Sequence, residues 1–461
     1  MGSHVRSVAG LVAAAVVLTG TLAGCGDDEP GASGTPSATP SSASSASSAS
    51  SASSAEPVTL TFGVYGKSPV VKAYSAAAKA YHQVDPSVTI KIKSWPDEYS
   101  MTSSLTGSGE APDVFLTPRA DVSRLSAAGV VQPVDTYLEA RNIDLGDSYS
   151  RAAVNDFSLD KHLVCMPYAV SPDVLYVNTD LVDFDAMKKR GLDVPDAPET
   201  GTWDLDDFAA AMKFATRPRK HIAGMYAAPN LRGLAPWLTA AGGSLVDDPK
   251  NPTRLALEDS TDAIKALWPT VLNQRFRLSA TQLEQATPLR WFERGQLAVL
   301  PGDRSLVPHL RGVPGLHWNV MAIPSTGDPA TVGDYSGLCL SEQTEDPDVA
   351  ADFLAYLVSA KAVAEVARTG YVVPVNQQVA YADAFVQPNR APANAAVFTS
   401  AIKGMTAIPA PHTFDQLQIV AGPQISKLLH PGIDVESVTQ TIDDLSTNVL
   451  RPVTPSASPT G

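Results

Sequence analysis

The sequence predicts an α/β fold, and two observations support this prediction. The 461-residue chain is 44% hydrophobic and only 18% charged, which provides for a large core and excludes a mostly disordered chain. Segments with strand patterning alternate along the chain with segments that have helical periodicity. Such alternation is typical of a mostly parallel sheet covered by helices. At about 100–200 residues per domain, the length allows two to four domains.

The first part of the chain shows the alternation most clearly. Five segments predict strand, helix, strand, helix and strand in turn, at residues 58–65, 70–83, 88–93, 99–105 and 112–116. The first segment is β-branched and apolar, the second repeats apolar residues near the helical period, and the third alternates polar with apolar residues. Later segments continue the series, with strands expected at 174–178, 297–300 and 318–323 and helices at 205–216, 347–359 and 361–369.

Charge and motif content exclude several classes of function. Lys and Arg total 34 against 48 Asp and Glu, so the net charge of −14 has the wrong sign for a nucleic-acid binder. The eight histidines are scattered singly, and the sequence has no His-Glu-x-x-His, Cys-x-x-Cys or Gly-x-Ser-x-Gly motif. We therefore expect no metal, no cofactor and no catalytic triad.

The N-terminal residues predict export and lipid anchoring. Residues 1–24 carry one charge, Arg6, followed by an apolar run too short to span a bilayer but suited to a signal peptide. Leu22-Ala23-Gly24-Cys25 resembles the lipobox of bacterial lipoproteins, which implies that Cys25 receives lipid and anchors the chain at the extracellular face of the cell membrane. Residues 25–56 are rich in Ser and Ala and predict a disordered tether. Residues 452–461 predict a disordered tail.

The other two cysteines have apolar sequence neighbours. Cys165 and Cys339 each lie among aliphatic residues, which favours buried free thiols. Because sequence does not give the distance between them, a disulfide bridge remains an open alternative.

A series of short motifs resembles one known family. The motifs follow each other in order from residue 58 to residue 450 and include Tyr65-Gly66-Lys67, residues 111–116, 166–178, 195–208, 240–243, 292–302, 318–324, 336–341 and 370–374. Together they resemble the solute-binding proteins of ABC importers, in the large group typified by maltose-binding protein. Each motif alone is weak, but their order is specific.

The resemblance implies a two-lobed, periplasmic-binding-protein-like fold of type II. Each lobe has a mixed, mostly parallel sheet flanked by helices, and hinge crossings are expected near residues 169–174, 332–337 and 386–392. Lobe 1 is expected at residues 57–170 and 337–388, and lobe 2 at 171–336 and 389–451. The implied function is to capture a carbohydrate between closing lobes and to deliver it to ABC permease subunits. We expect a monomer that is not an enzyme.

Candidate ligand-binding residues follow from strand ends and from the implied hinges. Sugars need charged or amide partners for their hydroxyls and aromatic rings for their apolar faces. The hydroxyl-binding candidates are Tyr65, Lys67, Arg119, Asp121, Asp173, Asn230, Arg232, Asp303, Arg304, Tyr335 and Tyr371. Trp95 and Trp237 are candidates for stacking, and Trp237 is the preferred platform, although both could equally be packing residues. Arg119 and Asp121 could instead form a surface ion pair.

Three alternative functions remain open. The same fold could bind another polar solute, such as a polyamine, a sugar phosphate or an anion. A secreted carbohydrate-active hydrolase would need two apposed carboxylates, for which Asp173 and Asp303 are the only nominees. A structural or signalling lipoprotein would lack a ligand-binding cleft.

Overall fold

The computed structural model describes residues 57–450, apart from residues 108, 147, 250, 409 and 410. The expected signal peptide, the Cys25 lipidation site, the tether at residues 25–56 and the tail at 452–461 lie outside the described residues. Within the described part, no helix has the length and apolarity needed to cross a membrane.

A first sheet has eight strands. Six follow in the order β13-β7-β12-β3-β1-β2, and β4 and β14 also pair with β12. The bounds are β1 Val58–Tyr65, β2 Val88–Trp95, β3 Val114–Pro118, β4 Val131–Gln132, β7 Cys165–Pro172, β12 Thr331–Ser341, β13 Val373–Pro374 and β14 Met405–Ala407. A second sheet has the order β11-β8-β10-β9, with β8 Val174–Asn178, β9 Ala223–Met225, β10 Leu297–Gly302 and β11 Trp318–Met321. A small hairpin pairs β5 Ser158–Leu159 with β6 His162–Leu163.

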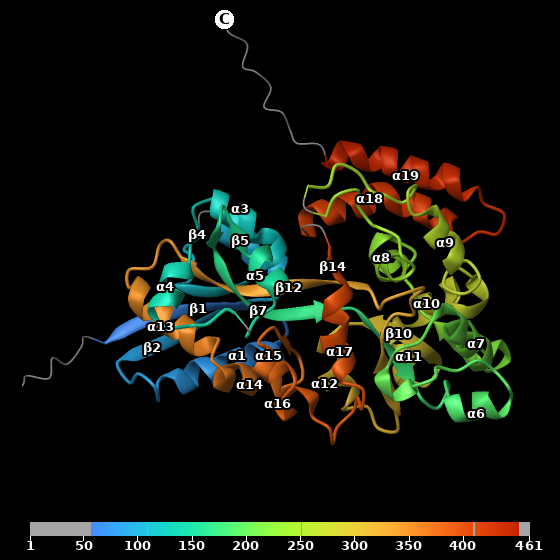
Figure 1. The fold of residues 1–461 in the computed structure, drawn as a ribbon, viewed down its shortest axis with the longest axis horizontal. Helices are drawn as coiled ribbons and strands as arrows, with labels where there is room; N and C mark the ends of the chain where they lie inside the picture. Colours follow the sequence, from blue (N-terminus) through green and yellow to red (C-terminus); the bar gives the residue numbers. More distant parts are fainter. Residues whose placement is uncertain (1–56, 108, 147, 250, 409–410, 451–461) are drawn as a thin grey trace, which may run out of the picture. The chain divides into compact units, whose positions relative to one another are not determined.

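Helices surround both sheets (Figure 1). Those between the strands of the first sheet, or packed with them, are α1 Ser68–Tyr81, α2 Glu98–Thr106, α3 Val122–Ala127, α4 Asp135–Ala140, α5 Arg151–Asp156, α13 Pro347–Leu357, α14 Ala360–Ala367, α15 Gln377–Ala380, α16 Asp383–Val386 and α17 Ala396–Ala401. The remainder are α6 Phe184–Lys189, α7 Leu205–Ala215, α8 Leu231–Ala240, α9 Thr261–Leu267, α10 Ala280–Gln285, α11 Pro288–Glu293, α12 Val307–Leu310, α18 Pro411–Lys427 and α19 Val435–Leu450.

The α/β class and the main predicted elements are confirmed. The first strand has the predicted bounds, and the predicted helix at 205–216 is α7, whose N-cap Asp204 accepts hydrogen bonds from the backbone N–H groups of Asp206 and Asp207. Both sheets are mixed, and they contain more antiparallel strand pairs than the expected mostly parallel sheets would contain. β1 is parallel to β2 and β3, and β9 to β10, whereas the pairs that involve β7 and β8 are antiparallel.

Strand β8 separates two hydrophobic cores. Val174 and Tyr176 belong to a buried cluster that continues under the first sheet, whereas Leu175 and Val177 belong to a second cluster with residues of α7, α8, α9, α18 and α19. Successive side chains of a strand point to opposite faces, so a strand with apolar residues at every position must be covered on both sides. This burial accounts for the near-continuous apolar run at residues 174–178.

Cys165 and Cys339 form a disulfide, which corrects the expectation of free thiols. They are register partners on the adjacent antiparallel strands β7 and β12, and both are fully buried. The bridge joins positions 174 residues apart in sequence. Apolar neighbours indicated burial correctly, but only the strand pairing brings the two thiols together.

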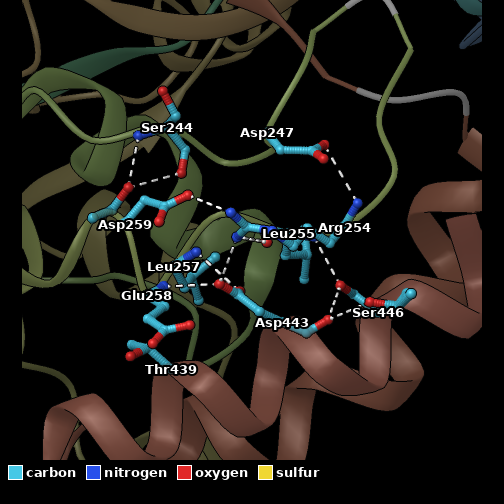
Figure 2. A network of polar contacts seen from close by, with 12 residues as sticks. Ser244, Asp247, Arg254, Leu255, Leu257, Glu258, Asp259, Thr439, Asp443 and Ser446 are labelled. Carbon is cyan, nitrogen blue, oxygen red and sulfur yellow. Dashed lines mark hydrogen bonds and ion pairs between the residues drawn. The ribbon is translucent and has the colours of Figure 1, made fainter.

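The C-terminal helix α19 is anchored by a buried carboxylate (Figure 2). Asp443 is 3% exposed, and its oxygens accept hydrogen bonds from the backbone N–H groups of Leu257 and Glu258, each at 2.9 Å. Arg254 Nη1 lies 3.2 Å from Asp443 Oδ2. Burial raises the pKa of Asp443 to about 6, and the two backbone donors and Arg254 oppose this shift. Helix α19 thereby provides the hydrogen-bond acceptor for the backbone N–H groups of the loop at residues 254–258.

We predict that replacing both Cys165 and Cys339 by alanine lowers the free energy of unfolding by about 2–5 kcal/mol, because the bridge restricts the unfolded chain. Urea unfolding of the variant and of the oxidised protein measures the difference. Denaturation and alkylation without reductant checks the bridge itself. Labelling of Cys165 or Cys339 under those conditions would contradict it.

We predict that Asp443→Ala costs about 2–4 kcal/mol, because two buried N–H groups and Arg254 lose their acceptor. Asp444→Ala is the matched control, since Asp444 is the exposed neighbour on the same helix, and its cost should stay within about 0.5 kcal/mol. Urea unfolding measures both. Equal losses in the two variants would rule out the anchoring role.

Candidate functional site

A cavity of about 440 Å³ receives residues from segments attached to both sheets. From the first sheet come the end of β1, the end of β3, the C-terminal part of β7 and the middle of β12; from the second come the start of α8 and the turn after β10. Its polar lining residues are Tyr65, Lys67, Asp97, Glu98, Ser171, Arg232, Asp303, Ser305, Asp334, Ser336 and Tyr371. In open α/β sheets, ligands bind at such carboxyl ends of strands.

A smaller cavity of about 310 Å³ adjoins the first one. It shares Arg232, Asp303 and Ser305 with it and adds Asp173 and Tyr226. We call the two together the solute cavity. The residues that line both parts of the solute cavity belong to α8 or follow β10.

The turn after β1 positions Tyr65 and Lys67. Gly66 has φ +118°, a backbone conformation that favours glycine, and it ends the strand so that α1 begins immediately after the N-cap residue Lys67. Tyr65 Oη lies 2.9 Å from Ser336 Oγ on β12, which fixes the ring at the cavity wall. The predicted placement of these two residues at a cleft edge agrees with the structure, and their contact with ligand stays a prediction.

Strand alternation along β12 decides which of its residues line the cavity. Asp334 and Ser336 line it, whereas Tyr335 is 5% exposed and lines a separate cavity of about 300 Å³. The predicted residue Arg119 stands behind Asp334: its Nε lies 3.5 Å from Asp334 Oδ1, and its Nη2 donates to the carbonyl of Ile408 at 3.2 Å. Arg119 therefore supports the cavity wall from outside.

A 3₁₀-helical turn at Arg304–Leu306 follows β10, and its successive side chains point in different directions. Asp303 and Ser305 line the cavity, and the Asp303 carboxylate accepts a hydrogen bond from the Ser305 backbone N–H at 2.8 Å. Arg304 lies on the other side and is 1% exposed. Its Nε donates to the carbonyl of Gly370 at 3.2 Å and its Nη2 to that of Phe385 at 3.0 Å. Burial lowers the pKa of Arg304 to about 10. The structure thus corrects the prediction that Arg304 faces the ligand.

Helix α8 and its N-cap carry three predicted residues, of which only Arg232 lines the solute cavity. Arg232 is exposed and lines both parts of the solute cavity. Asn230 is the N-cap of α8, and its side chain accepts a hydrogen bond from the Gly233 backbone N–H at 2.9 Å. Trp237 is fully buried, with its ring 5.3 Å from that of Phe208. The preferred stacking platform is therefore a core residue in this structure.

Two further predicted residues do not line the solute cavity. Trp95 lies at the end of β2 with Lys93 Nζ 5.2 Å from its ring centroid. Asp121 is 8% exposed and accepts a hydrogen bond from Thr102 Oγ1 at 2.8 Å. Tyr371, by contrast, lines the cavity, and its contact with ligand stays a prediction.

Sequence reasoning missed Glu98, Asp334, Ser336 and Ser305 as lining residues. Asp334 and Ser336 flank the predicted Tyr335, and Ser305 follows the predicted Arg304. For Asp334 and Ser336, which lie on β12, the signal that could have found them is strand parity, because a shift of one residue moves a side chain to the opposite face. Glu98 lies on α2 and Ser305 in the 3₁₀ turn after β10, where strand parity does not apply.

The solute cavity holds carboxylates that burial makes harder to ionise. Burial raises the pKa of Asp334 to about 7, against the opposing charge of Arg119. Burial also raises the pKa of Asp173 to about 6, although Arg232 acts in the opposite direction. The pKa of Glu98 is raised by burial and by Asp121. Within the described residues, Lys67 and Arg232 take part in no ion pair, so both remain available to a ligand.

The chemistry available is hydrogen bonding of both signs next to apolar surface. Lys67 and Arg232 are donors, the carboxylates are acceptors when ionised, and tyrosine and serine hydroxyls can be either. Val70, Leu116 and Val372 supply apolar lining. Among the residues that the structure covers, no group of three or more His, Cys, Asp or Glu side chains could hold a metal ion.

The raised pKa values predict a pH-dependent stability. The folded protein holds protons on Asp334 and Asp173 between about pH 4 and pH 7 that the unfolded chain releases, so the free energy of unfolding falls as the pH rises through this window. Asp334→Asn should reduce the slope by up to about 1.4 kcal/mol per pH unit. Urea unfolding between pH 4 and pH 8 measures the slope. Asp328→Asn, at an exposed carboxylate, is the control, and an equal slope in the two variants would contradict the assignment.

Comparison with known proteins identifies the family. The model of the bacterial extracellular solute-binding protein family matches residues 71–396. A similar structure is the ABC substrate-binding protein Lmo0181 from Listeria monocytogenes in complex with cycloalternan, with a TM-score of 0.69 and 18% identity over 85% of this chain and 98% of that one. Others are the GacH receptor of Streptomyces glaucescens, solved unliganded and with acarbose (0.66, 18%, 85% and 98%), and the sugar-binding protein MalE from Xanthomonas citri (0.69, 15%, 85% and 97%). These likenesses show a shared two-lobed fold, and the family match covers most of the chain. The protein therefore belongs to the bacterial extracellular solute-binding proteins.

Proposed function

We propose that this protein is the substrate-binding component of an ABC importer and that it captures a carbohydrate in the solute cavity. The observation that carries the proposal is the lining itself, which combines Lys67 and Arg232 with several carboxylates and apolar side chains, and which comes from segments of both sheets. A ligand that touches both sides favours the closed arrangement by the additional contacts that it makes there.

The balance of charges favours a neutral, hydroxyl-rich ligand. Glu98, Asp303 and Asp334 lie in the same cavity as Lys67 and Arg232, so neither sign of charge is alone. Sugar hydroxyls donate to carboxylates and accept from Lys and Arg, and they use both kinds of group at once. The aromatic lining consists of Tyr65, Tyr74, Tyr226 and Tyr371 rather than tryptophan. A cavity of about 440 Å³ also lies within the usual range for small-molecule sites.

The proposal includes lipid anchoring and a membrane partner. Cys25 carries the lipid, residues 25–56 tether the body at the extracellular face of the membrane, and a permease pair receives the ligand. The sugar-binding descriptions of the similar structures support this assignment of the ligand class. The lobes are proposed to divide as the sequence predicts, with the protein acting as a monomer.

We also propose that the protein performs no reaction on its ligand. The Asp303 carboxylate, which is one of the two nominees for hydrolysis, already caps the turn after β10 through the Ser305 N–H. Asp173 lies beside Arg232 in the smaller part of the cavity. Both carboxylates are thus explained as hydrogen-bonding groups of a binding site.

A thermal-shift screen of the full-length chain against mono- and oligosaccharides, polyamines and anions tests the ligand class. A carbohydrate at 100 times its dissociation constant should add about 2.7 kcal/mol to the stability of the folded state. Recovery of the intact sugar excludes turnover. A response to polyamines or anions alone would reject the carbohydrate assignment.

We predict that Arg232→Ala weakens binding of the carbohydrate at least tenfold, because loss of one charged partner of a ligand costs about 2 kcal/mol or more. Calorimetric titration measures the affinity. The matched control is Arg151→Ala, which removes an exposed arginine on α5 outside the cavity and should leave the affinity unchanged. Retained affinity in Arg232→Ala would remove this residue from the site.

A further inference from the structure

A second, separate cavity lies at the opposite end of the second sheet. Its volume is about 530 Å³. The parallel strands β9 and β10 run between the two: Tyr226 and Asp303, at their carboxyl ends, line the solute cavity, whereas Ala223 and Gln296, at their amino ends, line the second cavity. At roughly 3.3 Å per residue, the six residues of β10 span about 20 Å. A ligand in one cavity therefore does not occupy the other.

The charged residues that line this second cavity are all basic. Arg275 and Arg277 line it together with His221, and no carboxylate does. His221 ends a run of basic residues, Arg217-Pro218-Arg219-Lys220-His221, that leads into β9. We call this site the basic cavity. It lies in a chain whose net charge is −14, so the local charge is opposite to the overall charge.

These basic side chains are not neutralised within the protein. None of the ion pairs formed by the described residues involves an arginine or lysine of residues 217–220, or Arg275 or Arg277. Arg277 is partly buried, and its guanidinium donates only to backbone carbonyls, those of Ala227 and Val271. The Arg277 guanidinium is thus held by main-chain carbonyls toward Ala227, and the arginine that presents a free charge to the cavity is Arg275.

The remaining lining groups fit an oxyanion. The exposed Arg275 side chain makes no hydrogen bond or ion pair with any residue in the described ranges. The side chains of Thr281, Gln285 and Gln296 add further donors, and Trp291 forms an apolar wall. Guanidinium groups bind phosphate oxygens through paired N–H donors, and amide and hydroxyl donors complete such sites.

From this arrangement we propose that the basic cavity binds a phosphate group, independently of the solute cavity. The group can belong to a soluble phosphate or to the headgroup of an anionic phospholipid, because both present the same oxygens. Arg275 supplies the charge at the cavity, and Arg277 forms the fixed inner wall.

Calorimetric titration of the full-length chain, produced without lipidation, tests the proposal with inorganic phosphate and pyrophosphate. Sedimentation with vesicles of phosphatidylcholine, alone or mixed with phosphatidylglycerol, tests the headgroup source. We expect binding to at least one of these probes and a loss of at least tenfold in affinity in Arg275→Ala. Binding of free phosphates identifies a soluble ligand, whereas binding only to vesicles that contain phosphatidylglycerol identifies a headgroup.

Arg219→Ala is the matched control, because Arg219 is exposed in the same basic run but does not line the cavity. Its affinity should change less than twofold. Arg277 is not substituted, since it holds the carbonyl of Ala227 beside the solute cavity. Absence of binding to every probe, or equal losses in the Arg275 and Arg219 variants, would overturn the proposal. An unchanged thermal midpoint of Arg275→Ala confirms that any loss does not arise from unfolding.

Discussion

The antiparallel pairing of β7 with β12 holds the first sheet together at its centre and positions Ser171, Asp334 and Ser336 in the solute cavity. The disulfide between Cys165 and Cys339 joins the two strands at one pair of register partners. The pairing shifts between Gly337 and Ser336, and the register beyond this shift sets which β12 side chains point into the solute cavity. Only Asp173 separates the end of β7 from the start of β8, so the chain passes from the first sheet to the second within one residue. A movement between the sheets must therefore be accommodated close to Asp173 and at the beginning of β12, where Asp334 also lies.

The solute cavity places charged groups where water is partly excluded, and their pairing limits the cost. Arg119 stands behind Asp334, and Arg232 acts on both Glu98 and Asp173. The cavity carboxylates accept few hydrogen bonds within the described residues. Ligand hydroxyls would donate further hydrogen bonds to them and so offset the cost of removing these carboxylates from water. Binding and closure are in this view coupled by the same side chains. The same buried charges lower the free energy of unfolding of the ligand-free protein.

Sequence patterns predicted the α/β class and most regular elements because periodicity and capping are local properties. The strand at residues 58–65 and the capped helix after Asp204 are examples.

The residues that line the cavity were predicted only in part. Tyr65, Lys67, Arg232, Asp303 and Tyr371 line the cavity, but Tyr335 and Arg304 each lie one residue away from side chains that do. Parity depends on where strand pairing begins, and a bulge in the pairing of β7 with β12 lies between Ser336 and Gly337. The burial of Trp237 could not be predicted for another reason: a tryptophan suits a hydrophobic core and a ligand-binding site equally, so residue type alone does not distinguish the two.

In the proposed function, one ligand engages both sheets at the same time. Amide hydrogen exchange, with and without the carbohydrate that stabilises the protein, tests it most directly. We expect exchange to slow at the turn of Tyr65–Lys67 and along Asp334–Ser336 on the first sheet, and at the same time at Asp303–Ser305 on the second. Slower exchange confined to the segments of one sheet would contradict it.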